Sequence, residues 1–115
     1  MTHSKFNRVR SLRLGNAMKA NDLAGLVGLR SGTAISHFET GDRVPSLKVA
    51  LALQVVFGLK PDEMFPGLFS DVEDRVMARA RHLYEALEGK TGKRVELRRA
   101  LFEEMARRDS SDVGP

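Results

Sequence analysis

The sequence contains no cysteine, which excludes disulfide bridges and thiolate metal sites. Its three histidines are scattered, and they form no cluster with the spacing of metal ligands. The longest apolar run, VALALQVVFGL, is interrupted by Gln54 and is too short to span a bilayer. The first ten residues, MTHSKFNRVR, lack the apolar segment of a signal peptide. We therefore expect a soluble, cytoplasmic protein with no metal, no cofactor and no membrane partner.

The sequence also lacks the residue patterns of an enzyme. No Ser-His-Asp set or carboxylate pair has supporting context. The segment EGKTG suggests a phosphate-binding loop, but Tyr84 stands where that loop needs its first glycine. We predict that the protein is not an enzyme.

Positive charge is unevenly distributed along the chain. Residues 1–69 contain nine Lys and Arg against five Asp and Glu, whereas residues 70–115 contain ten of each. All of the net charge of +4 therefore belongs to the first part. Such an excess favours a polyanion such as nucleic acid as partner, although many solvated surfaces also carry it.

Helices are the only regular elements that the pattern predicts. No segment alternates for long with a period of two, and apolar residues recur every three or four positions, which is typical of an all-α fold. Glycines at 28, 41 and 58 suit helix ends, and Ser46 is a good N-cap. The expected helices cover about 6–17, 20–27 (with a start at Ala20 or Asn21), 31–40 (with a start at Ser31 or Thr33), 47–57, a short segment from Pro61, 71–88 and 93–107. We expect the core to contain Val9, Leu12, Leu14, Leu23, Ala24, Val27, Ile35, Phe38, Leu53 and Phe57.

The segment FPGLF at 65–69 is the clearest boundary in the chain. It predicts a domain over 1–69, a helical hairpin over 70–108 and a flexible tail over 109–115. After the boundary, Ser70 and Glu73 have the spacing of a capping box. The next helix carries one apolar stripe, Val72, Val76, Ala80, Leu83 and Leu87. The hairpin either packs back on the first domain or serves self-association, because the stripe is similar to a coiled-coil seam.

The stretch GLRSGTAISHFETGDRVPSL, residues 28–47, predicts a helix-turn-helix together with the helix before it. The first helix ends in glycine, and the second has apolar anchors with a polar outer face. Small residues are needed where the two helices cross, for which we expect Ala24 and Gly28. In this motif the second helix lies in the DNA major groove. Its outward side chains here are Thr33, Ser36, His37 and Thr40.

Residues 6–69 resemble the phage repressor and Cro type of helix-turn-helix domain, the XRE family. The most specific part is I-S-x-x-E-x-G-x-R-x-P-S, which begins at Ile35 and ends at Ser46, and the segment from Gly58 to Phe65 matches the fifth helix of the family. The resemblance implies a five-helix lambda-repressor-like domain, here followed by two C-terminal helices. It also implies sequence-specific binding to double-stranded DNA.

The resemblance assigns roles to particular residues. Glu39 would pair with Arg13 and place that arginine beside a phosphate. Lys19, the amides near Ala20, and Arg43 would also face the DNA backbone. The DNA-contacting residues of the second helix would be Thr33, Ser36, His37 and Thr40, the first three at base edges.

Two departures from the family pattern change these details. The turn before Ile35 is one residue longer than usual, which puts Arg30 and Ser31 on the DNA side. Ala20 stands where family members usually have a glutamine that contacts the backbone. Residues 33–40 contain no Arg, Asn or Gln, so specificity would depend on Arg30, hydroxyl groups, the Thr33 methyl and DNA shape.

We therefore predict a prokaryotic or phage transcriptional regulator, associated with the nucleoid. It would act as a repressor that binds a palindromic operator as a homodimer. The alternative is an antitoxin-like or adaptor protein whose C-terminal helices, within 70–108, bind another protein.

Overall fold

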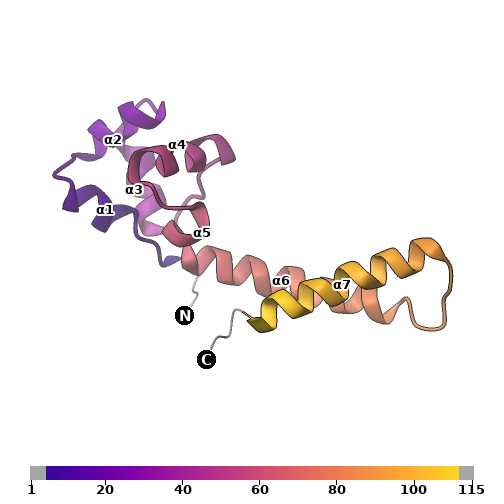
Figure 1. Cartoon of the computed structure of the whole chain (residues 1–115). Coiled ribbons are helices and arrows are strands. Elements are labelled where there is room, and N and C mark those ends of the chain that lie inside the picture. The colour runs from indigo at the N-terminus through magenta and orange to yellow at the C-terminus, as the bar shows by residue number, and fades with distance from the viewer. Residues whose placement is uncertain (1–4, 112–115) are drawn as a thin grey trace. The chain divides into compact units, whose positions relative to one another are not determined.

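The computed structural model describes residues 5–111, with side chains through residue 109. Every regular element among these residues is a helix (Figure 1), as the all-α prediction requires. The chain divides after Asp71 into two compact units, here called the N-terminal and the C-terminal unit. In chain order the helices are α1 (Val9–Gly15), α2 (Ala20–Val27), α3 (Gly32–Thr40), α4 (Leu47–Phe57), α5 (Pro61–Met64), α6 (Pro66–Glu85) and α7 (Lys93–Ser111).

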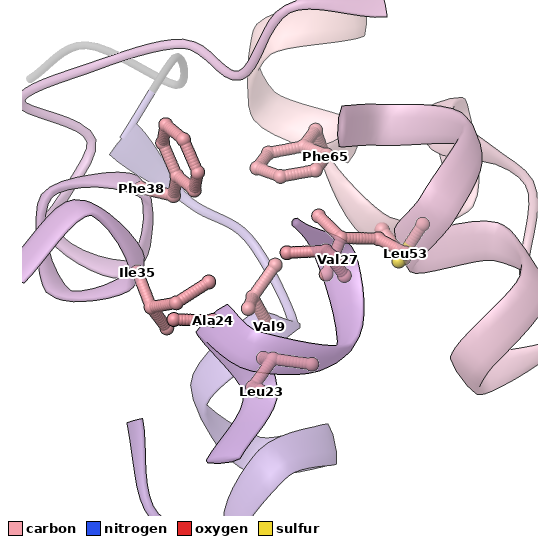
Figure 2. Close-up of a cluster of buried hydrophobic side chains, with 9 residues drawn as sticks. Val9, Leu23, Ala24, Val27, Ile35, Phe38, Leu53 and Phe65 are labelled. Carbon is pink, nitrogen blue, oxygen red and sulfur yellow. The ribbon is translucent and has the colours of Figure 1, made fainter. Parts of the chain in front are cut away.

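The N-terminal unit surrounds one hydrophobic core. Figure 2 shows side chains from α1 to α4 and from the end of α5 gathered in it, with the rings of Phe38 and Phe65 near each other. Leu23, Ile35 and Leu53 are completely buried. The core includes every residue predicted for α2 and α3, while Leu12 and Phe57 are partly buried at its edge. The buried cluster consists of Val9, Leu23, Ala24, Val27, Ile35, Phe38, Leu53, Met64 and Phe65.

Helix ends agree with the sequence prediction where a cap defines them. α4 begins and ends at the predicted residues, and α2 ends at the predicted Val27 and begins at Ala20, one of the two expected starts. Gly28 and Gly58 follow these helices with φ angles of 83° and 74°, a left-handed conformation that glycine adopts without steric cost. The Ser46 hydroxyl accepts a hydrogen bond from the Val49 amide at 3.2 Å and starts α4. α1 is shorter than predicted, and Leu14, expected in the core, is 53% exposed.

The predicted start of the sixth helix is wrong. α6 begins at Pro66, so Ser70 lies inside the helix and does not cap it. Proline suits the first turn of a helix because its missing N–H would have no partner there. Leu68, two residues further, packs against the core and so anchors this first turn to the N-terminal unit. The predicted domain boundary between residues 69 and 70 consequently falls within α6.

The C-terminal unit pairs the end of α6 with α7, and the two helices run antiparallel (Figure 1). The Tyr84 hydroxyl donates to Glu103 Oε2 at 2.8 Å, and Arg99 Nη2 donates to the Leu87 carbonyl at 3.1 Å. The predicted stripe on α6 is divided by this pairing. Ala80 and Leu87 are buried, whereas Val72, Val76 and Leu83 are 41–57% exposed.

α7 is longer than the sequence predicts. α7 continues to Ser111, so residues 109–111 of the predicted tail are helical, and 112–115 lie outside the described residues. Over residues 5–111, no helix combines the length and apolar character needed to cross a membrane.

Candidate nucleic-acid interface

α2, the turn at residues 28–31 and α3 form a helix-turn-helix. Gly28 ends α2 in the left-handed conformation, and the Leu29 amide donates back to the Ala24 carbonyl at 2.8 Å. The Gly28 amide donates to the Ala24 and Gly25 carbonyls as well, and together these bonds close the end of α2. Ser31 is extended and precedes α3. The turn, which the sequence predicts to be one residue longer than usual, therefore ends at Ser31, and α3 begins at Gly32.

The two helices approach closely at Gly32, a residue that the sequence prediction did not select. A Cβ at position 32 would lie 2.7 Å from Ala20 Cβ and 2.8 Å from the Asn21 backbone nitrogen. The Gly32 amide also donates to Asn21 Oδ1 at 2.7 Å, so α2 supplies a partner for the first N–H of α3. The prediction that Gly28 serves the crossing is wrong, because a Cβ at Gly28 would meet nothing within 4 Å. Its φ angle explains the glycine there.

The close contact between α2 and α3 at Gly32 also involves Ala20. In the resemblance it replaces a glutamine that would contact DNA. Here it is half-buried, and its backbone and Cβ lie against Gly32.

α3 presents hydroxyl groups on its outer face. Thr33, Ser36 and Thr40 are exposed, while Ile35 and Phe38 are buried on the opposite face. The three exposed positions are separated by three and four residues, so they share one side of the helix. An exposed polar face above an apolar anchor is compatible with a helix that enters a DNA groove.

The C-terminal end of α3 carries a small polar network. Thr40 Oγ1 is 3.0 Å from Asp42 Oδ2 and 3.2 Å from the His37 carbonyl, so its single hydrogen serves one acceptor at a time. His37 Nδ1 lies 3.8 Å from Asp42 Oδ2. The half-buried His37 and the exposed Thr40 are thus both close to Asp42, which the sequence prediction did not include. Because Asp42 is exposed and acidic, it disfavours a phosphate at this spot.

Glu39 and Arg13 form the ion pair that the motif predicts. Arg13 Nε donates to Glu39 Oε2 at 2.6 Å, and Nη2 donates to Oε1 at 3.1 Å. Their side chains are 12% and 6% exposed, so the pair is largely shielded from water. The hydrogen bond to Glu39 raises the pKa of Arg13 above its ordinary value. Arg13 Nη1 also donates to the Met18 carbonyl at 3.0 Å.

These contacts limit the N–H groups that Arg13 can donate to a ligand. Nε and both terminal nitrogens each have an internal acceptor, and little of the side chain reaches solvent. The pair therefore ties α1 to α3 and sets the position of α3. Contact with a phosphate, which the resemblance implies for Arg13, stays a prediction.

Asn7 is a second tie between the start of the chain and α3, and the sequence prediction did not include it. Asn7 Nδ2 donates to the Phe38 carbonyl at 2.9 Å and to the Glu39 carbonyl at 3.3 Å. Its Oδ1 accepts from the Val9 amide at 3.1 Å. One amide side chain thus serves the start of α1 and the end of α3, where backbone groups lack helical partners.

The basic residues predicted at the interface are exposed around the motif. Lys19 precedes α2, Arg30 lies in the turn beside the exposed Ser31, and Arg43 follows α3. No ion pair of Lys19, Arg30 or Arg43 occurs over residues 5–111. The Lys19 amide already donates to Asp22 Oδ2 at 3.0 Å, so that part of the α2 start is occupied by a carboxylate. In the same described range, no cluster of His, Asp and Glu could hold a metal ion.

Comparison with known proteins gives one match. Residues 7–65 match the sequence profile of a helix-turn-helix domain family, which covers more than half of the chain. The chain belongs to this family. No curated protein and no solved structure matches it. The matched range contains α1 to α5 and ends at Phe65.

Proposed function

We propose that the N-terminal unit binds double-stranded DNA and that α3 is the helix that enters the major groove. The observation that carries this proposal is the exposed hydroxyl face of α3, which lies between Arg30 at its start and Arg43 at its end. Positive side chains at both ends suit the phosphates on either side of a groove. The net charge of residues 1–69 agrees in sign with such a partner.

Base reading would depend on small groups. The hydroxyls of Thr33 and Ser36 can donate to or accept from base edges, and a threonine methyl can contact the methyl of thymine. α3 lacks Arg, Asn and Gln, the side chains that make bidentate contacts with bases. We infer that part of the specificity comes from Arg30 in the turn and from DNA shape.

We further propose that the protein is a transcriptional regulator, and specifically a repressor that occupies a palindromic operator as a dimer. The support is the resemblance of residues 6–69 to phage repressor and Cro type domains. One helix-turn-helix makes few base contacts, and two copies on adjacent half-sites bring affinity to the range of roughly 10⁻⁸ to 10⁻¹¹ M that is typical of specific sites.

The salt dependence of DNA binding tests the proposed phosphate contact of Arg43. Replacing Arg43 with alanine should weaken binding to all duplexes alike and reduce the slope of log K against log salt by about one unit. Arg98→Ala, at an exposed arginine of α7, is the matched control and should leave the slope unchanged. Fluorescence anisotropy with a labelled duplex between low and moderate salt measures both. Equal slopes for the Arg43 variant and the unmodified protein would remove Arg43 from the interface.

A second candidate function is the binding of another protein by the C-terminal unit. Leu83, Leu97 and Leu101 are 52–63% exposed. A groove of about 420 Å³ between α6 and α7 is lined by apolar and aromatic side chains, among them Met77, Tyr84 and Phe102, together with the charged Arg81, Glu103 and Asp109. Exposed apolar surface of this kind marks interaction sites. In this alternative the protein is an antitoxin-like or adaptor protein, and DNA binding is secondary.

The same surface is our candidate for self-association by the C-terminal helices. If Leu83 lies in a dimer interface, Leu83→Glu should give monomers, because a carboxylate would be buried without a partner. Light scattering of the folded variant measures the mass. A variant that stays dimeric would place the interface elsewhere.

A further inference from the structure

Asn21, in the first turn of α2, has one half of its side-chain amide bound and the other half free. Its Oδ1 accepts a hydrogen bond from the Gly32 amide at 2.7 Å. A backbone N–H can only donate, so the atom that faces it must be the oxygen, and the NH₂ group is directed elsewhere. Among the residues that the structure describes, none forms a hydrogen bond with Asn21 Nδ2. Because Asn21 is exposed, both N–H bonds of this group are available to a ligand.

The bond to Gly32 fixes the direction of these free donors. α2 and α3 are in close contact at this point, since a Cβ at position 32 would lie 2.8 Å from the Asn21 backbone nitrogen. An exposed side chain usually loses rotamer freedom when it binds a ligand, and this loss costs free energy. The side chain of Asn21 is already restricted by its bond within the protein. A ligand therefore meets a donor that is oriented before binding.

The charged residues next to Asn21 and Gly32 favour an anion as the ligand. Lys19 precedes α2, and Arg30 lies in the turn before α3. Both are exposed, and neither forms an ion pair within the described part of the chain. The acidic neighbour is Asp22, whose carboxylate turns back to the Lys19 amide at 3.0 Å. Consecutive residues of a helix do not face each other, so the Asp22 carboxylate and the Asn21 amide occupy different sides of α2.

We propose that Asn21 donates a hydrogen bond from Nδ2 to a phosphate of double-stranded DNA while its Oδ1 holds the start of α3. This proposal rests on the proposed DNA-binding function and adds a contact residue to it. In a helix-turn-helix the first helix crosses the DNA backbone and the second enters the groove, so a donor on α2 meets a phosphate. Asparagine is among the side chains that contact phosphate oxygens. One amide thus connects the position of α3 to a contact with the DNA backbone.

Two substitutions at residue 21 separate the DNA contact from the support of α3. Asn21→Ala removes both halves of the amide. Asn21→Asp keeps an oxygen that accepts from the Gly32 amide, but it replaces the NH₂ group with a second oxygen that repels phosphate. If Asn21 only supported α3, aspartate would restore the DNA affinity that alanine loses. For a phosphate contact, we expect the affinity to fall by roughly tenfold with alanine and further with aspartate.

Fluorescence anisotropy with two labelled duplexes of unrelated sequence measures these affinities. A phosphate contact predicts the same fold loss on both duplexes, because phosphates carry no sequence information. Asn16→Asp is the matched control for the added charge. Asn16 is an exposed asparagine of the same unit, and its Nδ2 already donates to the Leu12 carbonyl at 2.8 Å, so the affinity should change far less. Circular dichroism should show that the variants remain folded, and Asn21→Asp, which keeps the bond to Gly32, tests the contact even if the alanine variant is unstable.

The outcomes separate this proposal from the proposed function. If the Asn21→Asp protein binds as tightly as the unmodified protein, or more tightly than the Asn21→Ala protein, the residue only supports α3 and this proposal is wrong, while DNA binding stands. A loss on one duplex and not on the other would assign the amide to a base and overturn the phosphate contact. If the unmodified protein binds neither duplex, the proposed function fails and this proposal fails with it.

Discussion

The two units of this chain use apolar residues in different ways. The N-terminal unit gathers nine buried side chains from five helices into one cluster. It also connects α1 to α3 through the Arg13–Glu39 ion pair and through Asn7. In the described part of the C-terminal unit, Ala80 and Leu87 are the buried apolar residues, and most of the other apolar side chains stay accessible.

The difference indicates which unit can fold without help. Helices in proteins are stable mainly because one face packs against other elements, and small structures bury too little surface to be stable easily. The N-terminal unit satisfies this condition by itself. The α6–α7 pair has apolar surface left over, so its stability should be lower and should rise when another chain covers that surface.

The largest expected effect comes from opening the N-terminal core. Leu53→Ala should lower the free energy of unfolding by about 3 kcal/mol, because it removes a fully buried side chain and leaves a cavity. Leu87→Ala should cost clearly less, since the surroundings of Leu87 are open and can adjust. Urea denaturation followed by circular dichroism measures both variants. A loss at Leu87 as large as that at Leu53 would contradict the contrast between the units.

Next in size is the loss of the shielded ion pair. Glu39→Ala should lower stability by about 2 kcal/mol, because it leaves the Arg13 guanidinium without its charged acceptor in a site of low exposure. It should also weaken DNA binding while the fold survives, since α3 loses its attachment to α1. The control is Glu104→Ala, which removes the exposed pair with Arg107 in the C-terminal unit and should change little. Normal DNA affinity of the Glu39 variant would count against a positioning role for the pair.

A smaller effect is expected at the crossing of α2 and α3. Gly32→Ala should destabilise the unit by roughly 1–3 kcal/mol, because the new Cβ would meet the backbone of Ala20 and Asn21 at 2.8 Å. Gly25→Ala is the control within α2. A Cβ there meets nothing within 4 Å, and alanine should stabilise the helix by about 0.5–1 kcal/mol. If both alanines had the same effect, the close approach at Gly32 would be wrong.

The smallest effect concerns the pairing of α6 with α7. The hydrogen bond to Glu103 raises the pKa of Tyr84 above its ordinary value. A raised pKa in the folded state means that this contact is fully present below the ordinary tyrosine pKa and is lost as pH rises through the raised one. Tyr84 is the single tyrosine of the chain, so its ultraviolet absorbance titrates without overlap. Glu103→Gln should shift the midpoint down, and an unchanged midpoint would contradict the contact.

Local signals explain how much of the fold could be predicted. Gly28, Gly58 and Ser46 mark helix ends by local signals, so the end of α2 and both ends of α4 were predicted to the residue. The start of α6 was not, because it depends on Leu68 packing against a core assembled from distant segments. A capping-box pattern at Ser70 carries no information about that packing.

At the candidate site, too, contacts that belong to a local or known pattern could be predicted, whereas contacts between distant residues could not. The Arg13–Glu39 pair was accessible to prediction because a known motif contains it. The bonds of Asn21 to Gly32 and of Asn7 to Phe38 join residues 11 and 31 positions apart. Single asparagines give no sequence signal for such contacts. The exposed hydroxyl face of α3 followed from spacing alone.

Sequence-specific binding by the N-terminal unit can be tested by selection from random duplex DNA with the purified protein at moderate salt. We expect enrichment of a two-fold symmetric sequence, and the distance between its halves would give the spacing of the two α3 helices. A folded protein that retains no sequence above the starting pool would contradict sequence-specific DNA binding by the N-terminal unit.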